Sequence, residues 1–137
     1  MILKLYCDGG VIGGRNPGDG VYWSVGKAVG EDGRDTEVVV KDASYEYHSN
    51  NEAEYLALID AMQYAAQEFG NGYRRVIIHS DSQLIVNQYN GRWTCGQPHL
   101  QKLLATAQRN AEFLEKMGMT VEVMWVKRTV NVRRLGH

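Results

Sequence analysis

Residues 49–54, Ser49-Asn50-Asn51-Glu52-Ala53-Glu54, decide the fold, because they combine a helix start with an acid on an apolar face. Ser49 and Glu52 have the spacing of a capping box, in which each residue satisfies a backbone N–H of the other. The positions at helical spacing after Glu54 are all apolar: Ala57, Leu58, Ala61, Met62 and Ala65. Glu54 therefore heads the stripe of a helix that we expect to face the core.

An acid at the core-facing start of a helix needs a partner, because an ionised carboxylate is costly to bury without a compensating cation. Acids are also common in the first turn of ordinary surface helices, where the helix dipole favours them. Glu54 alone would fit that ordinary role. The positions of Asp8 and Asp81 favour a functional one.

A chain of 137 residues makes one domain, long enough to bury a core without disulfides or a structural metal. Its formal net charge of -1 disfavours a general binder of polyanions, which would carry a basic surplus. Cys7 and Cys95 form no CxxC pattern, so we expect packing roles, and the histidines lack the spacing of a zinc site. No apolar run is long enough to span a membrane. We expect a monomeric, cytoplasmic protein with no membrane contact.

Strand-like and helix-like segments alternate along the chain. We expect strands over 2–8, 21–29, 36–47, 74–79 and 120–126, and helices over 50–69, 82–89 and 98–117. Gly9-Gly10 is expected to turn the chain after the first strand, and Glu31-Asp32-Gly33 to close a hairpin. Asn16-Pro17-Gly18 is a turn by composition. The order βββαβααβ indicates a single α/β domain.

The connections place the ends of the first and fourth strands side by side. Three antiparallel strands lead into the first helix, and a right-handed crossover returns the fourth strand parallel to the first. The expected sheet is mixed and five-stranded, in the order 3-2-1-4-5, with strand 2 antiparallel and helices flanking it. Asp8 and Asp81 then end neighbouring strands, roughly 5 Å apart, and Glu54 enters from the helix that starts at that edge. Ligand sites of open α/β sheets lie at such carboxyl ends.

Three carboxylates this close together cannot all ionise cheaply unless a divalent cation neutralises them. Oxygen ligands without His or Cys favour Mg²⁺ or Mn²⁺ over zinc. Paired ions of this kind suit phosphodiester displacement, because one activates the attacking water and the other stabilises the leaving oxygen. The alternative is that the three are unrelated turn and cap acids, and their convergence makes that alternative weaker.

A sequence motif surrounds each of the three acids. The motifs are Leu5-Tyr6-Cys7-Asp8-Gly9-Gly10 with the Asn16-Pro17-Gly18 loop, Asn50-Asn51-Glu52-Ala53-Glu54 followed by Tyr55-Leu56-Ala57-Leu58, and His79-Ser80-Asp81-Ser82-Gln83-Leu84. In this order, over the first two thirds of the chain, they resemble the ribonuclease H family. The resemblance implies a ribonuclease H-like fold and an endonuclease that cuts the RNA strand of an RNA–DNA hybrid, leaving 3′-hydroxyl and 5′-phosphate ends.

The resemblance also implies roles for individual residues. Asp8, Glu54 and Asp81 would hold Mg²⁺ or Mn²⁺, with two ions per site when substrate is bound. Contacts with the hybrid, partly through its 2′-hydroxyl groups, would come from Gly9, Gly10, Asn50, Asn51 and Gln83. Helix-start chemistry alone would also account for Asn50 and Asn51, and a place in a helix first turn would account for Gln83.

The end of the chain departs from the family pattern. Relatives carry a fourth acid after an Asn near the C-terminus, whereas no Asp or Glu follows Glu122 here. Asn131 is the only side-chain amide or acid in this tail, and its oxygen can ligate a hard cation without adding charge. We expect Asn131 to replace the fourth acid as a catalytic and metal-binding residue. The alternative is an ordinary turn asparagine.

Other family features are also missing from the sequence. No histidine lies between Trp125 and Asn131, and the segment 90–100 has Arg92 as its only Lys or Arg. We therefore expect a short form without the basic protrusion or a hybrid-binding domain, and with the C-terminal helix nearly absent. Phosphate contacts would have to come from basic residues elsewhere, namely Lys102, Lys127, Arg128, Arg133 and Arg134.

Two other functions stay open at this point. One is a hybrid-binding module that lost its chemistry together with the fourth acid. The other is a different metal-dependent nuclease on the same fold, such as a resolvase, integrase or exonuclease. The presence of three mutually repelling acids favours an enzyme over a binding module, because a pure binder gains nothing from keeping them together.

Overall fold

The computed structural model of the chain describes residues 2–11, 21–29, 34–41 and 49–135. Its elements follow the order that the sequence predicts, with one more helix at the end. The strands are β1 (Ile2–Val11), β2 (Val21–Val29), β3 (Arg34–Lys41), β4 (Arg75–Ser80) and β5 (Thr120–Trp125). The helices are α1 (Asn50–Glu68), α2 (Gln83–Tyr89), α3 (Pro98–Met117) and α4 (Arg128–Leu135), and a 3-10 turn, η1 (Phe69–Asn71), follows α1.

The five strands form one mixed sheet in the order β3-β2-β1-β4-β5. β2 runs antiparallel to both of its neighbours, whereas β4 runs parallel to β1 and to β5. The predicted strand order and directions are therefore confirmed. The pairing of β1 with β4 ends at Cys7 and Ser80, so Asp8 and Asp81 take the next positions at the carboxyl ends of adjacent strands.

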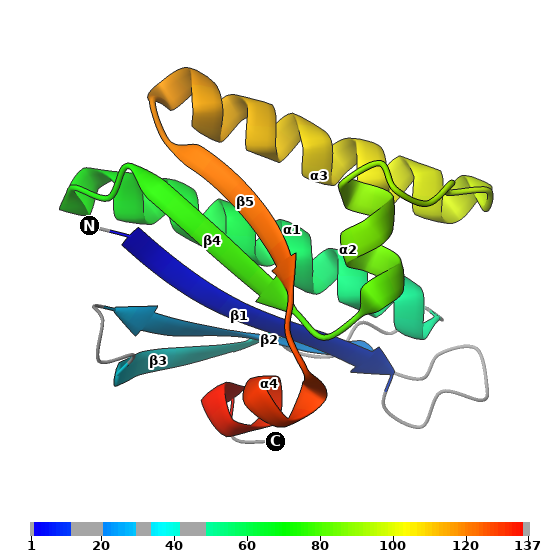
Figure 1. Cartoon of the computed structure of the whole chain (residues 1–137), viewed down its shortest axis with the longest axis horizontal. Coiled ribbons are helices and arrows are strands. Elements are labelled where there is room, and N and C mark those ends of the chain that lie inside the picture. The colour runs from blue at the N-terminus through cyan, green and yellow to red at the C-terminus, as the bar shows by residue number, and fades with distance from the viewer. Residues whose placement is uncertain (1, 12–20, 30–33, 42–48, 136–137) are drawn as a thin grey trace.

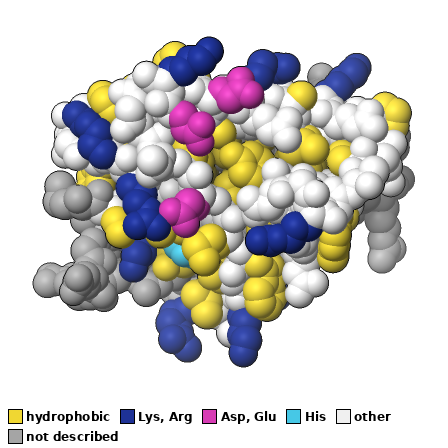
Figure 2. Space-filling model, turned by 45° about the horizontal axis from the view of Figure 1, so that its top comes forward, with side chains coloured by type: hydrophobic (Ala, Val, Ile, Leu, Met, Phe, Trp, Pro, Cys, Tyr) yellow, Lys and Arg dark blue, Asp and Glu magenta, His cyan; other side chains and the backbone are white. Residues whose placement is uncertain are grey.

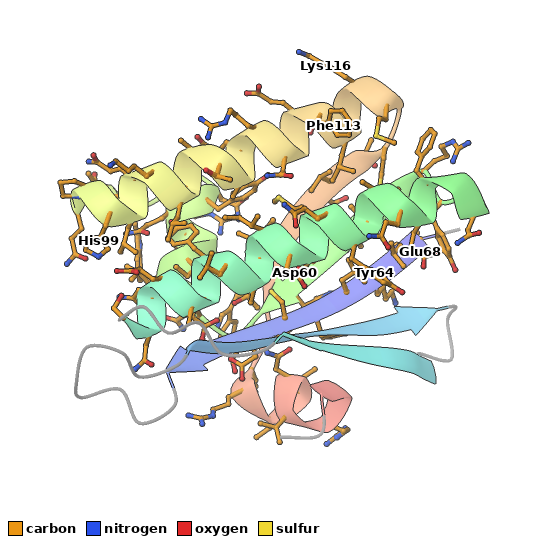
Figure 3. The ribbon with its side chains drawn as sticks, turned by 180° about the vertical axis from the view of Figure 1, so that it is seen from behind. Asp60, Tyr64, Glu68, His99, Phe113 and Lys116 are labelled. Atoms are coloured by element: carbon orange, nitrogen blue, oxygen red, sulfur yellow. The ribbon has the colours of Figure 1, made fainter. Side chains whose placement is uncertain are left out.

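Helices cover the two faces of the sheet unequally. α1 and α3 lie side by side on one face and begin at the same end of the molecule, where Figure 3 labels His99 at the start of α3. α4 lies on the opposite face, against β1 and β2 (Figure 1). The carboxyl ends of β1 and β4 are therefore flanked by the start of α1 from one face and by α4 from the other.

The main core fills the space between the sheet and the pair α1 and α3. Alternate residues of β1, namely Leu3, Leu5 and Cys7, are buried in it. Because successive side chains of a strand face opposite sides, Tyr6 belongs to the other face. There its ring packs against Val130 of α4. Asp8 has the same parity as Tyr6, so α4 lies on the face of the sheet to which this acid belongs.

The helix starts and ends follow local sequence signals. The predicted apolar stripe of α1 is buried: Ala57, Leu58, Ala61, Met62 and Ala65 each expose 1% or less of their surface. Ser49 Oγ accepts a hydrogen bond from the Glu52 backbone N–H at 3.2 Å, as expected for the cap. α3 begins at Pro98 and stops at Gly118, whose φ of 106° is the left-handed conformation that favours glycine.

Two local predictions are wrong. β1 continues through Gly9 and Gly10 to Val11, so the glycines lie in the strand and do not turn the chain. The C-terminal helix is present as α4, because packing of Val130 on Tyr6 stabilises a segment with little helical signal of its own. The predicted hairpin at 31–33, the loop at 16–18 and the end of the third strand beyond Lys41 lie outside the described residues.

The cysteines behave as predicted from their spacing. Both are free thiols, Cys7 lies in the core, and Cys95 packs against it. Across the described segments, no helix combines the length and apolar character needed to cross a bilayer.

Candidate active site

The three predicted acids meet at the carboxyl edge of the sheet. One oxygen from each of Asp8, Glu54 and Asp81 lies within 4.8 Å of the corresponding oxygens of the other two. Each of the three residues is half-buried, and no histidine or cysteine belongs to the group. β1, α1 and β4 therefore converge as the topology predicted, and the donor set consists of oxygen atoms alone.

Glu54 reaches the two strand acids because the start of α1 lies directly on β1 at Gly9. A Cβ atom at Gly9 would lie 2.2 Å from the carbonyl oxygen of Ala53, which is too close for any side chain. A Cβ atom at Gly10 would meet nothing within 4 Å. Gly9 therefore permits the close approach of helix and strand, and its backbone N–H also donates a hydrogen bond to the Glu54 carboxylate.

The carboxyl group of Glu54 has a strongly raised pKa. Burial, followed by the charges of Asp8 and Asp81, raises the pKa of Glu54 to about 9, and a hydrogen bond with Asp8 acts in the same direction. The hydrogen bond from Gly9 opposes this shift. Oε2 of Glu54 is buried and finds no hydrogen-bond partner among the described residues. Without a cation, Glu54 therefore keeps its proton at neutral pH, and it also leaves one buried acceptor atom unused.

Helix α4 compensates part of this negative charge. Burial and the charge of Asp8 raise the pKa of Asp81, whereas a hydrogen bond from Asn131 and the Arg128 guanidinium lower it. Asn131 is 1% exposed, and its Nδ2 donates a hydrogen bond of 2.9 Å to the carbonyl oxygen of Cys7. The helix that the sequence did not predict therefore contributes both a cation and an amide to the site.

The turn that carries Asp81 is held by neighbouring backbone and side-chain groups. The Ser82 N–H donates to Ser80 Oγ at 3.1 Å. The indole Nε1–H of Trp125 donates to the carbonyl oxygen of Asp81 at 3.1 Å. The Val126 N–H donates to the carbonyl oxygen of Ser80 at 2.9 Å. The last residue of β5 and the first residue of its connection to α4 therefore hold the carbonyl groups of Asp81 and Ser80.

A cavity of about 460 Å³ opens over the three acids. Its lining comes from β1, from the starts of α1 and α4, and from the turn after β4: Asp8, Gly9, Gly10, Asn50, Asn51, Glu54, Asp81, Ser82 and Arg128. Four of the five predicted substrate contacts thus share one cavity with the acids. The fifth, Gln83, is an exposed residue in the first turn of α2 and is not part of the lining, so its contact stays a prediction.

The metal-ligand role of Asn131 also stays a prediction. The structure brings Asn131 to the site, but the hydrogen bond there uses its amide nitrogen. Its Oδ1 is buried without a hydrogen-bond partner in the part of the chain that the structure describes. Sequence reasoning missed Ser82 and Trp125, although strand positions point to both. Ser82 directly follows Asp81, and Trp125 pairs with Ser80 across the β4–β5 ladder.

The described basic side chains are scattered over one face of the molecule. On the face shown in Figure 2, Lys and Arg side chains are scattered and do not gather into one patch. Of the basic residues considered for phosphate contact, Arg128 lines the cavity, whereas Lys102 lines a separate groove between α1 and α3. Among the described residues, Arg128 is therefore the basic residue that can reach a ligand in the cavity from its lining.

Comparison with known proteins places this site in a family context. The profile of a family described as reverse transcriptase-like matches residues 24–133, which is most of the chain. The chain belongs to the reverse transcriptase-like family. Its domain is ribonuclease H-like, because solved type 1 ribonucleases H superpose on nearly all of the chain.

Three solved ribonuclease H structures illustrate the likeness. The N-terminal RNase H domain of Rv2228c from Mycobacterium tuberculosis has a TM-score of 0.75 at 26% identity, covering 96% of this chain and 92% of that chain. LC11-RNase H1 in complex with an RNA/DNA hybrid has a TM-score of 0.75 at 25% identity, covering 96% and 90%. RNase H1 of Halobacterium salinarum has a TM-score of 0.77 at 24% identity, covering 98% and 92%, and shows the shared fold alone.

Curated relatives of this ribonuclease H-like domain are longer proteins. The chain is 30% identical over 131 residues to the bifunctional protein Rv2228c of Mycobacterium tuberculosis, covering 96% of this chain and 33% of that protein. It is 38% identical over 58 residues to the uncharacterized protein YpeP of Bacillus subtilis, covering 42% of this chain and 25% of that protein. The chain therefore spans a third or less of the length of the curated relatives it matches.

Proposed function

We propose that this chain is a Mg²⁺- or Mn²⁺-dependent endonuclease that hydrolyses the RNA strand of RNA–DNA hybrids and leaves 3′-hydroxyl and 5′-phosphate ends. The observation that carries the proposal is the convergence of Asp8, Glu54 and Asp81 within one cavity. The ribonuclease H-like domain supports the choice of reaction. LC11-RNase H1, which is bound to an RNA/DNA hybrid, supports the choice of substrate.

The acids present at the site fit a pair of hard divalent cations. Their oxygen donors are the type that Mg²⁺ and Mn²⁺ prefer. The unused Oε2 of Glu54 is a buried acceptor that a cation would satisfy. The raised pKa of Glu54 has burial and the repulsion of Asp8 and Asp81 as its main causes, and a cation would offset both. Bound cations would supply the Lewis acidity that activates water and stabilises the leaving oxygen.

The remaining cavity residues have roles in binding and orientation. Asn50 and Asn51 line the cavity at the start of α1 and present side-chain amides suited to the 2′-hydroxyl and base edges of a nucleic acid. Arg128 places a guanidinium in the same cavity, where it suits a phosphate oxygen of the backbone. The low overall charge implies that phosphate contacts are few, so binding is expected to be weak.

One observation keeps a second function in view. The family resemblance implies a fourth acid near the C-terminus, whereas no Asp or Glu follows Glu122 in this chain, and the acid group of the described residues has three members. If cation binding is too weak for turnover, the same cavity would serve to bind hybrids without cutting them. The two functions differ in whether product forms when divalent ions are supplied.

The test is a cleavage assay with end-labelled RNA–DNA hybrid, double-stranded RNA and double-stranded DNA of one sequence. Each duplex is incubated with Mn²⁺, with Mg²⁺ and with a chelator. We expect RNA-strand products from the hybrid alone, only with divalent ions, and bearing 5′-phosphates. The variant Asp8→Asn serves as the control for contaminating nucleases. Hybrid binding without product in either metal would establish the binding module, and equal cleavage of DNA duplex would contradict the proposed specificity.

A further inference from the structure

Asn131 makes a contact that a simple replacement ligand would not need. It sits one turn into α4, almost completely buried, and its Nδ2 donates to the carbonyl oxygen of Cys7 at 2.9 Å. Cys7 is the last residue at which β1 pairs with β4, and it directly precedes Asp8. The amide nitrogen of Asn131 is therefore attached to β1 at the position where the parallel ladder ends and the first acid begins.

The same amide nitrogen also serves the second strand. A side-chain hydrogen bond also joins Asn131 to Asp81, and because carboxylate oxygens accept hydrogen bonds, its donor is the amide nitrogen of Asn131. A carboxamide has its two donor hydrogens on the nitrogen, so one Nδ2 can serve Cys7 and Asp81 together. Turning the amide over would place Oδ1 against the carbonyl oxygen of Cys7, which disfavours that orientation. Oδ1 is left without a partner among the described groups.

We propose that Asn131 is a positioning residue that acts through its amide nitrogen, holding the ends of β1 and β4 so that Asp8 and Asp81 face one another across the metal site. Trp125 supports the same turn from the main chain, because its indole N–H donates to the carbonyl oxygen of Asp81. Helix α4 and the end of β5 thus hold the main chain next to the acids of β1 and β4. This inference rests on the proposed metal site and deepens it.

The variant Asn131→Asp separates a positioning role from a ligand role. An aspartate has nearly the same shape but no N–H, so it would set a carboxylate against the Cys7 carbonyl and the Asp81 carboxylate. A ligand at this position would gain a charge and bind cations more tightly. A positioning residue would lose its donor, and the loss of such outer contacts typically weakens metal binding about 10- to 100-fold.

The experiment measures Mn²⁺ binding to the protein by calorimetry, in the absence of nucleic acid. The measurements are made without urea, under conditions in which each variant is folded. We expect Asn131→Asp and Asn131→Ala to weaken binding about 10- to 100-fold, with Asp no better than Ala. Trp125→Phe keeps the ring and removes its donor, and should weaken binding only about two- to threefold. Val132→Ala, at an exposed position next to Asn131, is the matched control and should bind as the parent does.

Backbone amide resonances provide a second measurement that needs neither metal nor activity. In the metal-free protein, Asn131→Asp and Asn131→Ala should shift the resonances of both Asp8 and Asp81, whereas Val132→Ala should leave them in place. Tighter Mn²⁺ binding by Asn131→Asp would overturn the inference in favour of a ligand role. Shifts confined to α4 would also overturn it. If the parent binds no Mn²⁺, the proposed metal-dependent function fails, and the resonances of Asp8 and Asp81 still decide the role of Asn131.

Discussion

The two ends of strand β4 differ in the charges that surround their acidic residues. At its start, Arg75 forms an exposed ion pair of 2.6 Å with Glu122 of the neighbouring strand β5. Just beyond its end, Asp81 meets two further acids, Asp8 and Glu54, within 4.8 Å. Both ends carry a carboxylate on the sheet, but the first is paired with a cation, whereas the second lies beside two further acids that Arg128 compensates only in part.

This difference distinguishes a structural ion pair from a group of acids suited to binding a ligand. The Arg75–Glu122 pair has low electrostatic cost and low value, since exposed ion pairs contribute about 0–1 kcal/mol. At the other end, burial and the charges of the neighbouring acids raise the pKa values of Glu54 and Asp81. A cluster that costs stability in the absence of a cation is the arrangement expected of a binding site.

The largest expected effect comes from removing the acids one at a time. Asp8→Asn, Glu54→Gln and Asp81→Asn should each lower hybrid cleavage by more than about 100-fold, because a direct ligand should matter more than the outer contacts whose loss costs 10- to 100-fold. Stability in urea should hold or rise, since each change relieves repulsion. Glu122→Gln is the control at the other end of β4 and should leave cleavage unchanged while costing about 0–1 kcal/mol.

Either of two results would contradict this distinction between the two ends of β4. Near-normal cleavage by one of the three site variants would remove that residue from the site. A loss of stability in all three, equal to or larger than that of Glu122→Gln, would show that the acids are held by compensating contacts and act as structural charges.

The next effect concerns the backbone contact that allows the acids to meet. Gly9→Ala should destabilise the protein by about 1–3 kcal/mol or more, because the added methyl meets the main-chain carbonyl of Ala53 and neither can shift cheaply. It should also weaken Mn²⁺ binding by moving Glu54. Gly10→Ala places its methyl in open space and should change stability by about 0.5 kcal/mol or less. Equal effects of the two substitutions in urea unfolding would mean that α1 does not rest on β1 at Gly9.

The acids were predictable from the sequence because each follows from a general rule. Asp8 and Asp81 end apolar strand segments, and a right-handed crossover sets those strands side by side. Glu54 heads an apolar helical stripe that the structure buries. Periodicity and chain topology determine these placements without knowledge of any side-chain contact.

The second half of the site was harder to predict because it depends on tertiary packing. α4 has little helical signal, and it forms where Val130 packs on Tyr6 and Asn131 bonds to the end of β1. The sequence shows an amide at position 131 but not which of its two atoms faces the acids. The need for glycine at position 9 likewise depends on a backbone approach that no local pattern reveals.

The smallest expected effect is a pH dependence of stability in the metal-free protein, and it sharpens the contrast between the two ends of β4. The folded-state pKa of Glu54 is raised to about 9, so the folded state binds more protons than the unfolded state between about pH 4.5 and 9. Stability supplied by protonated Glu54 is then fully present below that window and is lost as the pH rises through it. The raised pKa of Asp81 acts in the same direction.

Glu54→Gln removes this dependence, because a neutral amide does not titrate. Urea unfolding of parent and variant with a chelator at pH 5, 7 and 9 should show a stability advantage of Glu54→Gln that grows with pH. Glu122→Gln, which alters an acid already paired with Arg75, should show no such growth. Parallel stability curves for the parent and Glu54→Gln would mean that Glu54 ionises freely in the folded protein. The carboxylates would then repel one another less than their spacing requires, and the main physical argument for a cation at this edge of the sheet would be lost.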